Sequence, residues 1–114
     1  MEIDKDKSKE LLNRAYLRII ELINNPNISD IERIYAKFVI GAYYYFGLGN
    51  TEKDYNKAFK IIKECADNGH IAVIYDLGAN FYFNGKGTDV NYKLADYYLN
   101  IAKVNGLKKA KNLY

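Results

Sequence analysis

Residues 40–49 of the chain read IGAYYYFGLG, and residues 77–87 repeat this stretch as LGANFYFNGKG. In each copy a Gly-x-Gly turn follows a run of apolar residues, which is typical of a helix that ends in a tight turn. Each copy then continues into a second apolar-periodic segment that ends in Asn-Gly, at residues 68–69 and 105–106. The sequence therefore predicts a repeated helix–turn–helix unit.

The spacing of the two copies sets the length of this unit. Shifting the chain along itself by 37 residues places Gly41 on Gly78 and Tyr45 on Tyr82, whereas the Gly-x-Gly turns match at a shift of 38. We therefore expect one extra residue in a different loop of each unit. Gly41 and Gly78 fall inside predicted helices, where Gly costs about 1 kcal/mol relative to Ala. That cost predicts a close approach of packed helices at both positions.

This ordered set of glycines and alanines resembles the Sel-1-like repeat, a relative of the tetratricopeptide repeat. The resemblance implies an all-α fold, a right-handed α/α superhelix of about two repeats that span residues 28–69 and 70–106. It also implies a single domain in which residues 1–27 form an N-terminal cap and residues 107–114 form a C-terminal cap or a truncated helix. The residues that carry the resemblance are Ala36, Ile40, Gly41, Tyr44, Gly47, Gly49, Asp54, Lys57, Ala58, Cys65, Ala66 and Gly69 in the first copy, and Leu77, Gly78, Phe81, Gly85, Gly87, Asn91, Ala95, Ala102 and Gly106 in the second.

Helical spacing and stop signals divide the chain into predicted helices over residues 8–23, 30–46, 54–68, 70–83 and 91–105. Residues 24–27 contain Asn and Pro and end the first helix, and Ser29 with Glu32 forms a capping box that begins the second. Gly69 is placed to take the left-handed position after the third helix. The fifth helix is expected to stop at Gly106, and the tail is apolar enough to start a sixth. In the second helix the stripe expected to face the core comprises Ile31, Ile34, Tyr35, Phe38, Ala42 and Tyr45.

Composition excludes several classes of protein. The 114 residues suffice for one domain, and the net charge of +3 is too small to indicate nucleic-acid binding. A single cysteine, Cys65, allows neither an internal disulfide nor a thiolate metal site, so a reducing, cytoplasmic location is expected. No apolar stretch near the N-terminus or elsewhere indicates a signal sequence or a membrane span.

Four features that might carry chemistry each have a simpler structural interpretation. The Gly-x-Gly segments lie between helices and lack the spacing of a phosphate-binding loop. His70 is the only histidine and lacks the partners of a catalytic or metal cluster. Cys65 occupies a small-residue position, so a buried side chain is expected rather than a reactive thiol. The basic tail, with Lys103, Lys108, Lys109 and Lys111, is expected to be a solvated helix face. We therefore predict no catalytic residue, no cofactor and no metal.

Tyrosine is unusually frequent, with 12 residues and no tryptophan. The resemblance places Tyr44, Tyr55, Tyr75, Tyr92 and Tyr98 in the core. Other aromatic residues lie on the first helices of the repeats, which line the concave surface of related solenoids, and Tyr suits a protein interface. For this second group an interface and an inter-repeat core remain alternatives. The residues predicted to bind a partner are Tyr43, Tyr45, Asn80 and Tyr82.

The expected function is a non-enzymatic protein–protein interaction module, or adaptor, because a repeat architecture here lacks catalytic groups. A free-standing chain of this size also suits an immunity protein that neutralises a cognate toxin or effector. A hydrolase-type enzyme is disfavoured, because the relatives linked to such activities are rich in cysteine. The exposed ends of the array could also stack two chains together. Neither nucleic acid nor a membrane is expected as a partner.

Overall fold

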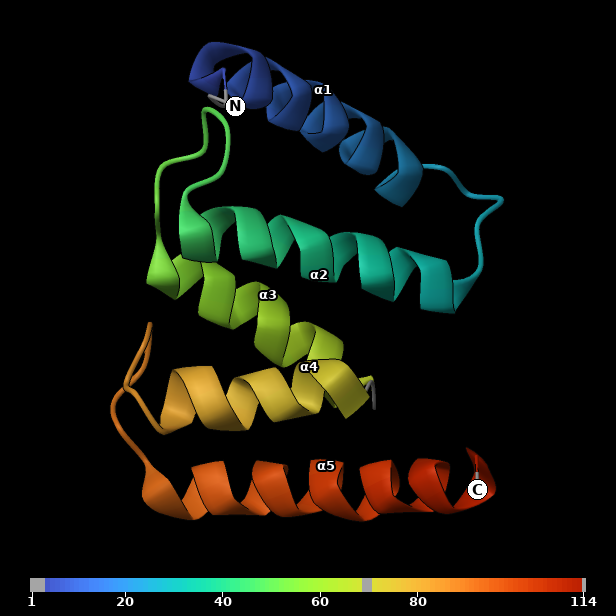
Figure 1. Cartoon of the computed structure of the whole chain (residues 1–114), viewed down its shortest axis with the longest axis vertical. Coiled ribbons are helices and arrows are strands. Elements are labelled where there is room, and N and C mark those ends of the chain that lie inside the picture. Colours follow the sequence, from blue (N-terminus) through green and yellow to red (C-terminus); the bar gives the residue numbers. More distant parts are fainter. Residues whose placement is uncertain (1–3, 69–70, 114) are drawn as a thin grey trace.

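The computed structural model of the chain is a stack of helices that follow one another in chain order (Figure 1). It describes residues 4–68 and 71–113, without the side chains of residues 107–113. Each helix packs mainly on its neighbours in the sequence, and the described residues form no strand. The predicted all-helical fold is confirmed. The elements are α1 (Lys5–Ile23), α2 (Asp30–Phe46), α3 (Tyr55–Asp67), α4 (Ile71–Asp76), the π-helix η1 (Leu77–Tyr82) and α5 (Tyr92–Leu113).

Side-chain caps fix the starts of α1, α2, α3 and α5, and at α5 the Leu94 N–H donates to Asn91 Oδ1. Asp4 accepts a hydrogen bond from the backbone N–H of Lys7 at the start of α1, and Asp54 caps α3 in the same way. At the start of α2, Ser29 Oγ accepts from the backbone N–H of Glu32 at 3.2 Å, which confirms the predicted start near Asp30. Such caps satisfy backbone donors that have no partner inside the helix.

Glycine makes the tight turns that follow α2 and η1. The backbone φ angle is positive at Gly47, Gly49, Gly85 and Gly87, with values between 60° and 67°, as the Gly-x-Gly pattern predicts. At Gly47 this left-handed conformation ends α2, and the Gly47 N–H donates to the carbonyl of Tyr43. A residue with a Cβ would be strained there. The chain can therefore reverse direction between two packed helices within a few residues.

The core lies between α3, α4, η1 and α5. Its most enclosed large side chains include Ile62, Leu77 and Phe81. Cys65 is buried among them, as predicted, and burial raises the pKa of its thiol. The alanines that carry the resemblance in the second helix of each copy are all buried, namely Ala58, Ala66, Ala95 and Ala102.

The two helical glycines lie where helices touch, as predicted. A Cβ on Gly41 would approach Ile62 Cδ1 of α3 to 2.8 Å, and a Cβ on Gly78 would approach the carbonyl oxygen of Ala95 on α5 to 3.1 Å. Two helical hairpins result, which we call the first hairpin (α2 and α3) and the second hairpin (α4, η1 and α5). In each hairpin the glycine lies at the contact between the two helices.

The extra residue of the second hairpin lies inside a helix rather than in a loop, so that part of our prediction is wrong. At residues 77–82 the helix widens into a π turn, in which the Phe83 N–H donates to the carbonyl of Gly78, five residues back, at 3.1 Å. A π turn holds one residue more than the corresponding α-helix. With Asn80 left out, the second copy reads LGAFYFNGKG and matches IGAYYYFGLG position for position. Asn80 is therefore the inserted residue.

Backbone hydrogen bonds after the turns give the true correspondence of the hairpins. The carbonyl of Tyr44 accepts from the Asp54 N–H at 2.8 Å, and the carbonyl of Tyr82 accepts from the Asn91 N–H at 2.9 Å. Tyr82 therefore corresponds to Tyr44 and not, as we predicted, to Tyr45. By the same shift Phe81, rather than Asn80, corresponds to Tyr43.

The end of the last helix also differs from the prediction. α5 continues through Gly106 to Leu113, so the expected stop at Gly106 and the separate sixth helix are wrong. Apart from the helix's own backbone, no atom of the described residues lies within 4 Å of a Cβ built on Gly106, in contrast to Gly41 and Gly78. Gly69 and His70, with the roles considered for them, lie outside the described residues. No helix in the described parts of the chain is both long and apolar enough to cross a membrane.

Candidate partner-binding surface

Two of the four residues predicted to bind a partner are buried and cannot do so in this structure. Tyr43 is only 3% exposed, packs against Tyr16 with 5.2 Å between the ring centroids, and donates its hydroxyl to the carbonyl of Leu12 at 2.8 Å. Tyr82 is 6% exposed and stacks on Tyr98. Their role is to join α1 to α2 and η1 to α5, which corrects the prediction for both.

The other two predicted residues, Tyr45 and Asn80, meet in one pocket between α2 and η1. This inter-helix pocket has a volume of about 290 Å³. Its walls are mostly apolar, because α2 supplies aromatic and alanine side chains and α3 supplies Ile62. The ring of Tyr45 lies 5.5 Å from that of Phe81 and joins α2 to η1 at the pocket wall. The lining residues are Phe38, Gly41, Ala42, Tyr45, Phe46, Ile62, Asp76, Asn80 and Phe81.

Among the described residues that line this pocket, Asp76 alone carries a charged side chain. Its carboxylate accepts a hydrogen bond from the side-chain amide of Asn80, one turn along the helix. Burial raises the pKa of the Asp76 carboxyl above its usual range, and the hydrogen bond from Asn80 opposes that shift only in part. The described residues form no ion pair with Asp76. The pocket therefore joins an apolar wall to a partly desolvated negative charge.

The sequence did not single out Asp76, although one signal was present. At the shift of 37 that holds before the π turn, Asp76 stands where the first hairpin has Val39. A charged residue at a position that is apolar in the other copy marks a local difference in environment. Its meaning became visible only when η1 placed Asn80 beside it.

A stripe of exposed apolar residues runs along α2 beside the pocket. Ile31 is 64% exposed and Phe46 is 62% exposed, although both are large and apolar. The stripe therefore corrects the expectation that Ile31 and Tyr35 face the core, because the buried side of α2 carries Ala36, Ile40 and Tyr43 instead. We call this set the α2 stripe, and its members are Ile31, Tyr35, Val39 and Phe46.

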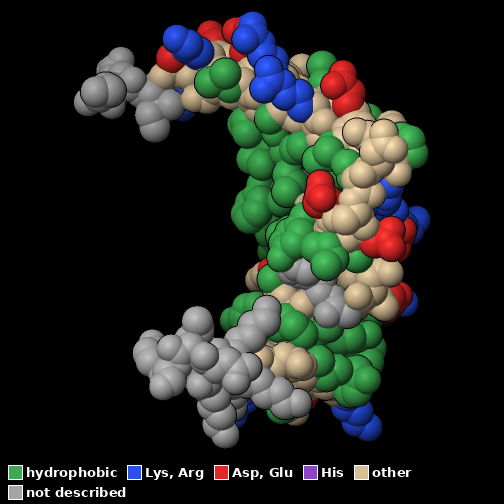
Figure 2. Space-filling model, turned by 90° about the vertical axis from the view of Figure 1, so that its right-hand side faces the viewer, with side chains coloured by type: hydrophobic (Ala, Val, Ile, Leu, Met, Phe, Trp, Pro, Cys, Tyr) green, Lys and Arg blue, Asp and Glu red, His purple; other side chains and the backbone are tan. Residues whose placement is uncertain are grey.

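Hydrophobic side chains also gather on one hollowed side of the molecule, in the middle of the stack (Figure 2). Acidic and basic side chains lie mainly on the outer side and on the end of the stack formed by α1. In the second hairpin the large exposed apolar residues include Tyr75, Phe83 and Tyr92, so the predicted core positions of Tyr75 and Tyr92 are wrong. The described surface is thus divided into an apolar region and a charged region.

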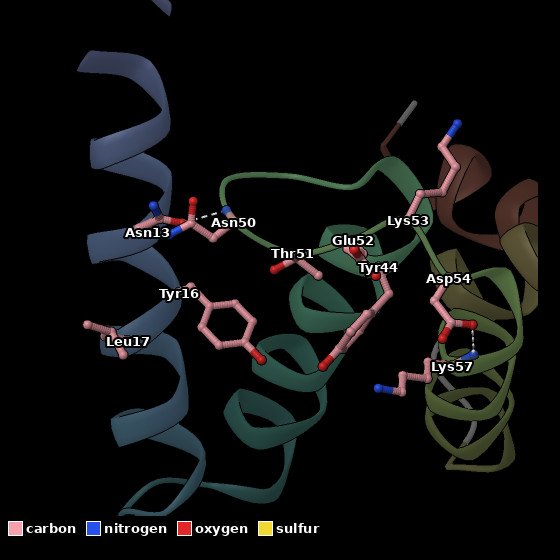
Figure 3. Close-up of a pocket in the computed structure, with 10 residues that line it drawn as sticks. All are labelled: Asn13, Tyr16, Leu17, Tyr44, Asn50, Thr51, Glu52, Lys53, Asp54 and Lys57. Carbon is pink, nitrogen blue, oxygen red and sulfur yellow. Dashed lines mark hydrogen bonds between the residues drawn. The ribbon is translucent and has the colours of Figure 1, made fainter. Parts of the chain in front are cut away.

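A second cavity, of about 500 Å³, lies between α1, α2 and the loop that leads to α3 (Figure 3). Its lining is largely polar. The side chains of Tyr16 and Tyr44 point toward each other from α1 and α2, and Lys57 of α3 lies beside them. The Lys57 ammonium lies 5.3 Å from the centroid of the Tyr44 ring, a distance typical of a cation–π contact. A hydrogen bond with Tyr44, together with burial, raises the pKa of Tyr16.

The polar groups of this second cavity are largely occupied in holding the fold together. Asn13 Oδ1 accepts from the Asn50 N–H at 2.7 Å and ties the loop to α1. Asp54 accepts from the Lys57 N–H at 3.1 Å and caps α3. Lys53 and Glu52 bring opposite charges to the same cavity. The cavity therefore carries both signs of charge, and most of its polar groups already have a partner within the protein. This arrangement does not indicate one class of ligand.

The arrangement of acidic, cysteine and histidine side chains bears on metal binding. Residues 4–68 and 71–113 contain no group of three His, Cys, Asp or Glu side chains placed to hold a metal ion. In comparisons with protein-family models, with curated proteins and with solved structures, no match to this chain was found. The resemblance to the Sel-1-like repeat therefore stays a prediction.

Proposed function

We propose that the chain is a protein–protein interaction module that binds a partner protein on the α2 stripe and the adjoining inter-helix pocket. The observation that carries this proposal is the second apolar side of α2. One side of this helix is buried against α1 and α3, and the opposite side still exposes Ile31 and Phe46. A surface helix normally has one apolar stripe that faces the core and polar residues opposite it, so a second, exposed apolar stripe indicates a contact with another molecule.

Three features of this surface support a protein as the occupant. Contiguous apolar patches on a soluble protein are typical of interaction sites. Aromatic residues are enriched at interfaces, and here Phe46 and Tyr45 stand at the junction of stripe and pocket. The pocket volume of about 290 Å³ is at or below the lower limit for a drug-sized ligand, so one protein side chain fills it more readily than a cofactor.

We also propose that the stack is a short α/α superhelix of the Sel-1-like type, as the residue pattern implies. Equivalent hydrogen bonds after the two turns support a common unit, since Tyr44 and Tyr82 accept from Asp54 and Asn91 in the same way. The radius of gyration of 15.8 Å exceeds the value of about 13 Å expected for a compact domain of this size. An open stack of this kind offers a longer surface to a partner than a closed bundle does.

An affinity pull-down from the native source, with the tagged full chain as bait, tests the binding function. The test variant combines Ile31→Glu and Phe46→Glu, which place charges on the α2 stripe without touching a buried side chain. The control variant combines Leu11→Glu and Tyr97→Glu, which change exposed apolar residues on α1 and α5. We expect a stoichiometric partner that the control retains and the test variant loses, while circular dichroism shows both to be folded.

A partner bound equally by both variants would overturn the placement of the surface, and the absence of any stoichiometric partner would overturn the function. The identity of the captured protein separates the two forms of the proposal. A toxin or effector whose activity is abolished in the complex would make the chain an immunity protein. A partner without such activity would make it an adaptor.

A further inference from the structure

The inter-helix pocket differs from the rest of the proposed surface because it contains a charge. We infer that it receives a lysine or arginine side chain of the partner protein, with the aliphatic stem against the apolar wall and the cationic head on Asp76. This inference rests on the proposed function and adds the chemistry of the partner segment. The partner segment is then a basic amphipathic one, with a cation beside the apolar residues that cover the α2 stripe.

Charge complementarity is the first argument. The Asp76 carboxylate is half-buried, and its only hydrogen bond from the described residues comes from the neutral amide of Asn80. A carboxylate withdrawn from water without a cation is costly, and a cation supplied from outside offsets this cost. The other described residues that line the pocket carry no charge of either sign. An anionic or wholly apolar segment would leave the Asp76 charge desolvated without compensation.

The shape and lining of the pocket are the second argument. Lysine and arginine bury their methylene stems on apolar surface while the charged head reaches a polar group. Ala42 and Phe38 of α2 offer such a surface, with Ile62 behind them. Aromatic rings of Tyr45, Phe46 and Phe81 also line the space, and a cation over such a ring gains further attraction.

The π turn is the third, independent argument. Single π turns are rare within helices and occur frequently at functional sites. Here the inserted residue is Asn80, and its side chain contacts Asp76. The first hairpin has no counterpart of either group, since it has a regular helix and Val39 at the corresponding position. The departure of the second hairpin from the first therefore produces the polar end of the pocket.

Peptide selection tests the inference without knowledge of the natural partner. The probes are random peptides displayed on phage and selected against the immobilised full chain. Enriched peptides are then synthesised, and their affinities are measured by fluorescence polarisation for the wild type, Asp76→Asn and Glu52→Gln. The Glu52→Gln variant is the matched control, because it removes one carboxylate from the surface of the other cavity.

We expect the enriched peptides to carry a lysine or arginine next to apolar residues. Asp76→Asn should weaken their binding by about tenfold, close to the lower end of the coupling between close charge pairs at interfaces. Glu52→Gln should leave the affinity within about twofold. Replacing the peptide lysine by norleucine should cause the same loss as Asp76→Asn, and the two changes together should cause little more than either alone.

Three outcomes would overturn the inference: no enriched peptide, enriched peptides without a basic residue, or basic peptides that bind Asp76→Asn as tightly as the wild type. These outcomes are separable from a failure of the proposed function. If the natural partner no longer binds Ile31→Glu/Phe46→Glu but still binds Asp76→Asn, the proposed binding function stands and only the cation pocket is refuted. If the partner binds the stripe variant as it binds the wild type, the proposed binding surface is itself refuted.

Discussion

The two hairpins are built from nearly the same sequence, but they hold their extra residue in different places. In the first hairpin α2 is a regular helix, and the loop from Gly49 to Asp54 is one residue longer than the loop from Gly87 to Asn91. In the second hairpin the loop is shorter, and Asn80 widens the helix into η1. From the helical glycine to the start of the next helix, the two hairpins therefore have the same number of residues. The extra residue lies in the loop of the first hairpin and in the helix of the second.

Packing explains why the extra residue of the second hairpin stays in the helix. On one side Gly78 is held against the backbone of Ala95, and on the other Gly87 is packed against the carbonyl of Tyr55. Because packing fixes both glycines, the additional residue between them cannot lengthen the loop that follows Gly87. It widens one helical turn instead. The comparison teaches that a repeat can gain a local polar site without a change in its turns or its core.

The largest effect should come from the core position that ties the hairpins together. Phe81 is 1% exposed and contacts Tyr45 of the first hairpin and Phe59 of α3. Phe81→Ala should lower the free energy of unfolding by about 3–5 kcal/mol, through lost burial and the cavity left behind. Chemical denaturation followed by circular dichroism measures the change. Phe83→Ala is the control, because Phe83 is largely exposed, and a similar loss there would contradict the assignment of the core.

Much of this architecture could be predicted from the sequence, because it depends on local signals. Ser29, Pro26 and the glycines with positive φ determine where chains turn and helices start, whatever packs on them. The two copies align at a shift of 37 residues up to Gly78 and at a shift of 38 from Gly85. This change also indicates that one residue is inserted between those positions. Whether that residue forms a loop or a π turn depends on packing against Ala95 and Tyr55, which residue spacing does not reveal.

The candidate site was harder to predict for the same reason. Tyr43 and Tyr45 are two residues apart on one helix, and only the positions of α1 and η1 decide which of them is buried. The apolar residues of α2 satisfy helical spacing on more than one side, so the pattern did not distinguish the core side from the α2 stripe. Asp76 gained significance only from its contact with Asn80.

Moving the inserted residue tests the comparison directly. A variant with Asn80 deleted and an asparagine added between Gly87 and Thr88 gives the second hairpin the helix and loop lengths of the first. We expect it to fold, with a free energy of unfolding unchanged or raised by up to about 2 kcal/mol, because irregular functional segments are often held at some cost in stability. The same variant should lose the basic peptides described above. Denaturant unfolding measures the stability, and a loss of more than about 2 kcal/mol would show that the π turn is needed for folding.

A smaller effect should distinguish the two buried tyrosines of α2 and η1. Tyr43→Phe removes the hydrogen bond from the Tyr43 hydroxyl to the carbonyl of Leu12, which joins α2 to α1. Loss of one such bond should lower the free energy of unfolding by about 1 kcal/mol. In Tyr82→Phe, no hydrogen bond of the hydroxyl to the described residues is lost, and the effect should stay below about 0.5 kcal/mol. Hydrogen exchange should show faster opening of α1 amides in Tyr43→Phe alone, and equal effects would argue against that contact.

The smallest effect concerns Asp76 and Val39, which share a position before the π turn. Burial raises the pKa of Asp76 in the folded chain above its ordinary value of 3.8, so the folded state binds this proton more tightly than the unfolded state. The contribution of Asp76 to stability is therefore fully present below pH 3.8 and is lost as the pH rises through the folded pKa. Within the described part of the chain, no other charged side chain lines the pocket to offset that loss.

Asp76→Asn should consequently become more stable relative to the wild type as the pH rises from below 3.8 toward neutrality, and the difference should level off once the folded carboxyl is ionised. Denaturant unfolding of both proteins across this pH range measures the difference, with Glu52→Gln as the control for a general change in net charge. A difference that shrinks with rising pH would mean that the folded chain already stabilises the Asp76 charge. In that case Asp76 would need no cation from a partner. It would be only a structural replacement for the valine that the first hairpin has at this position.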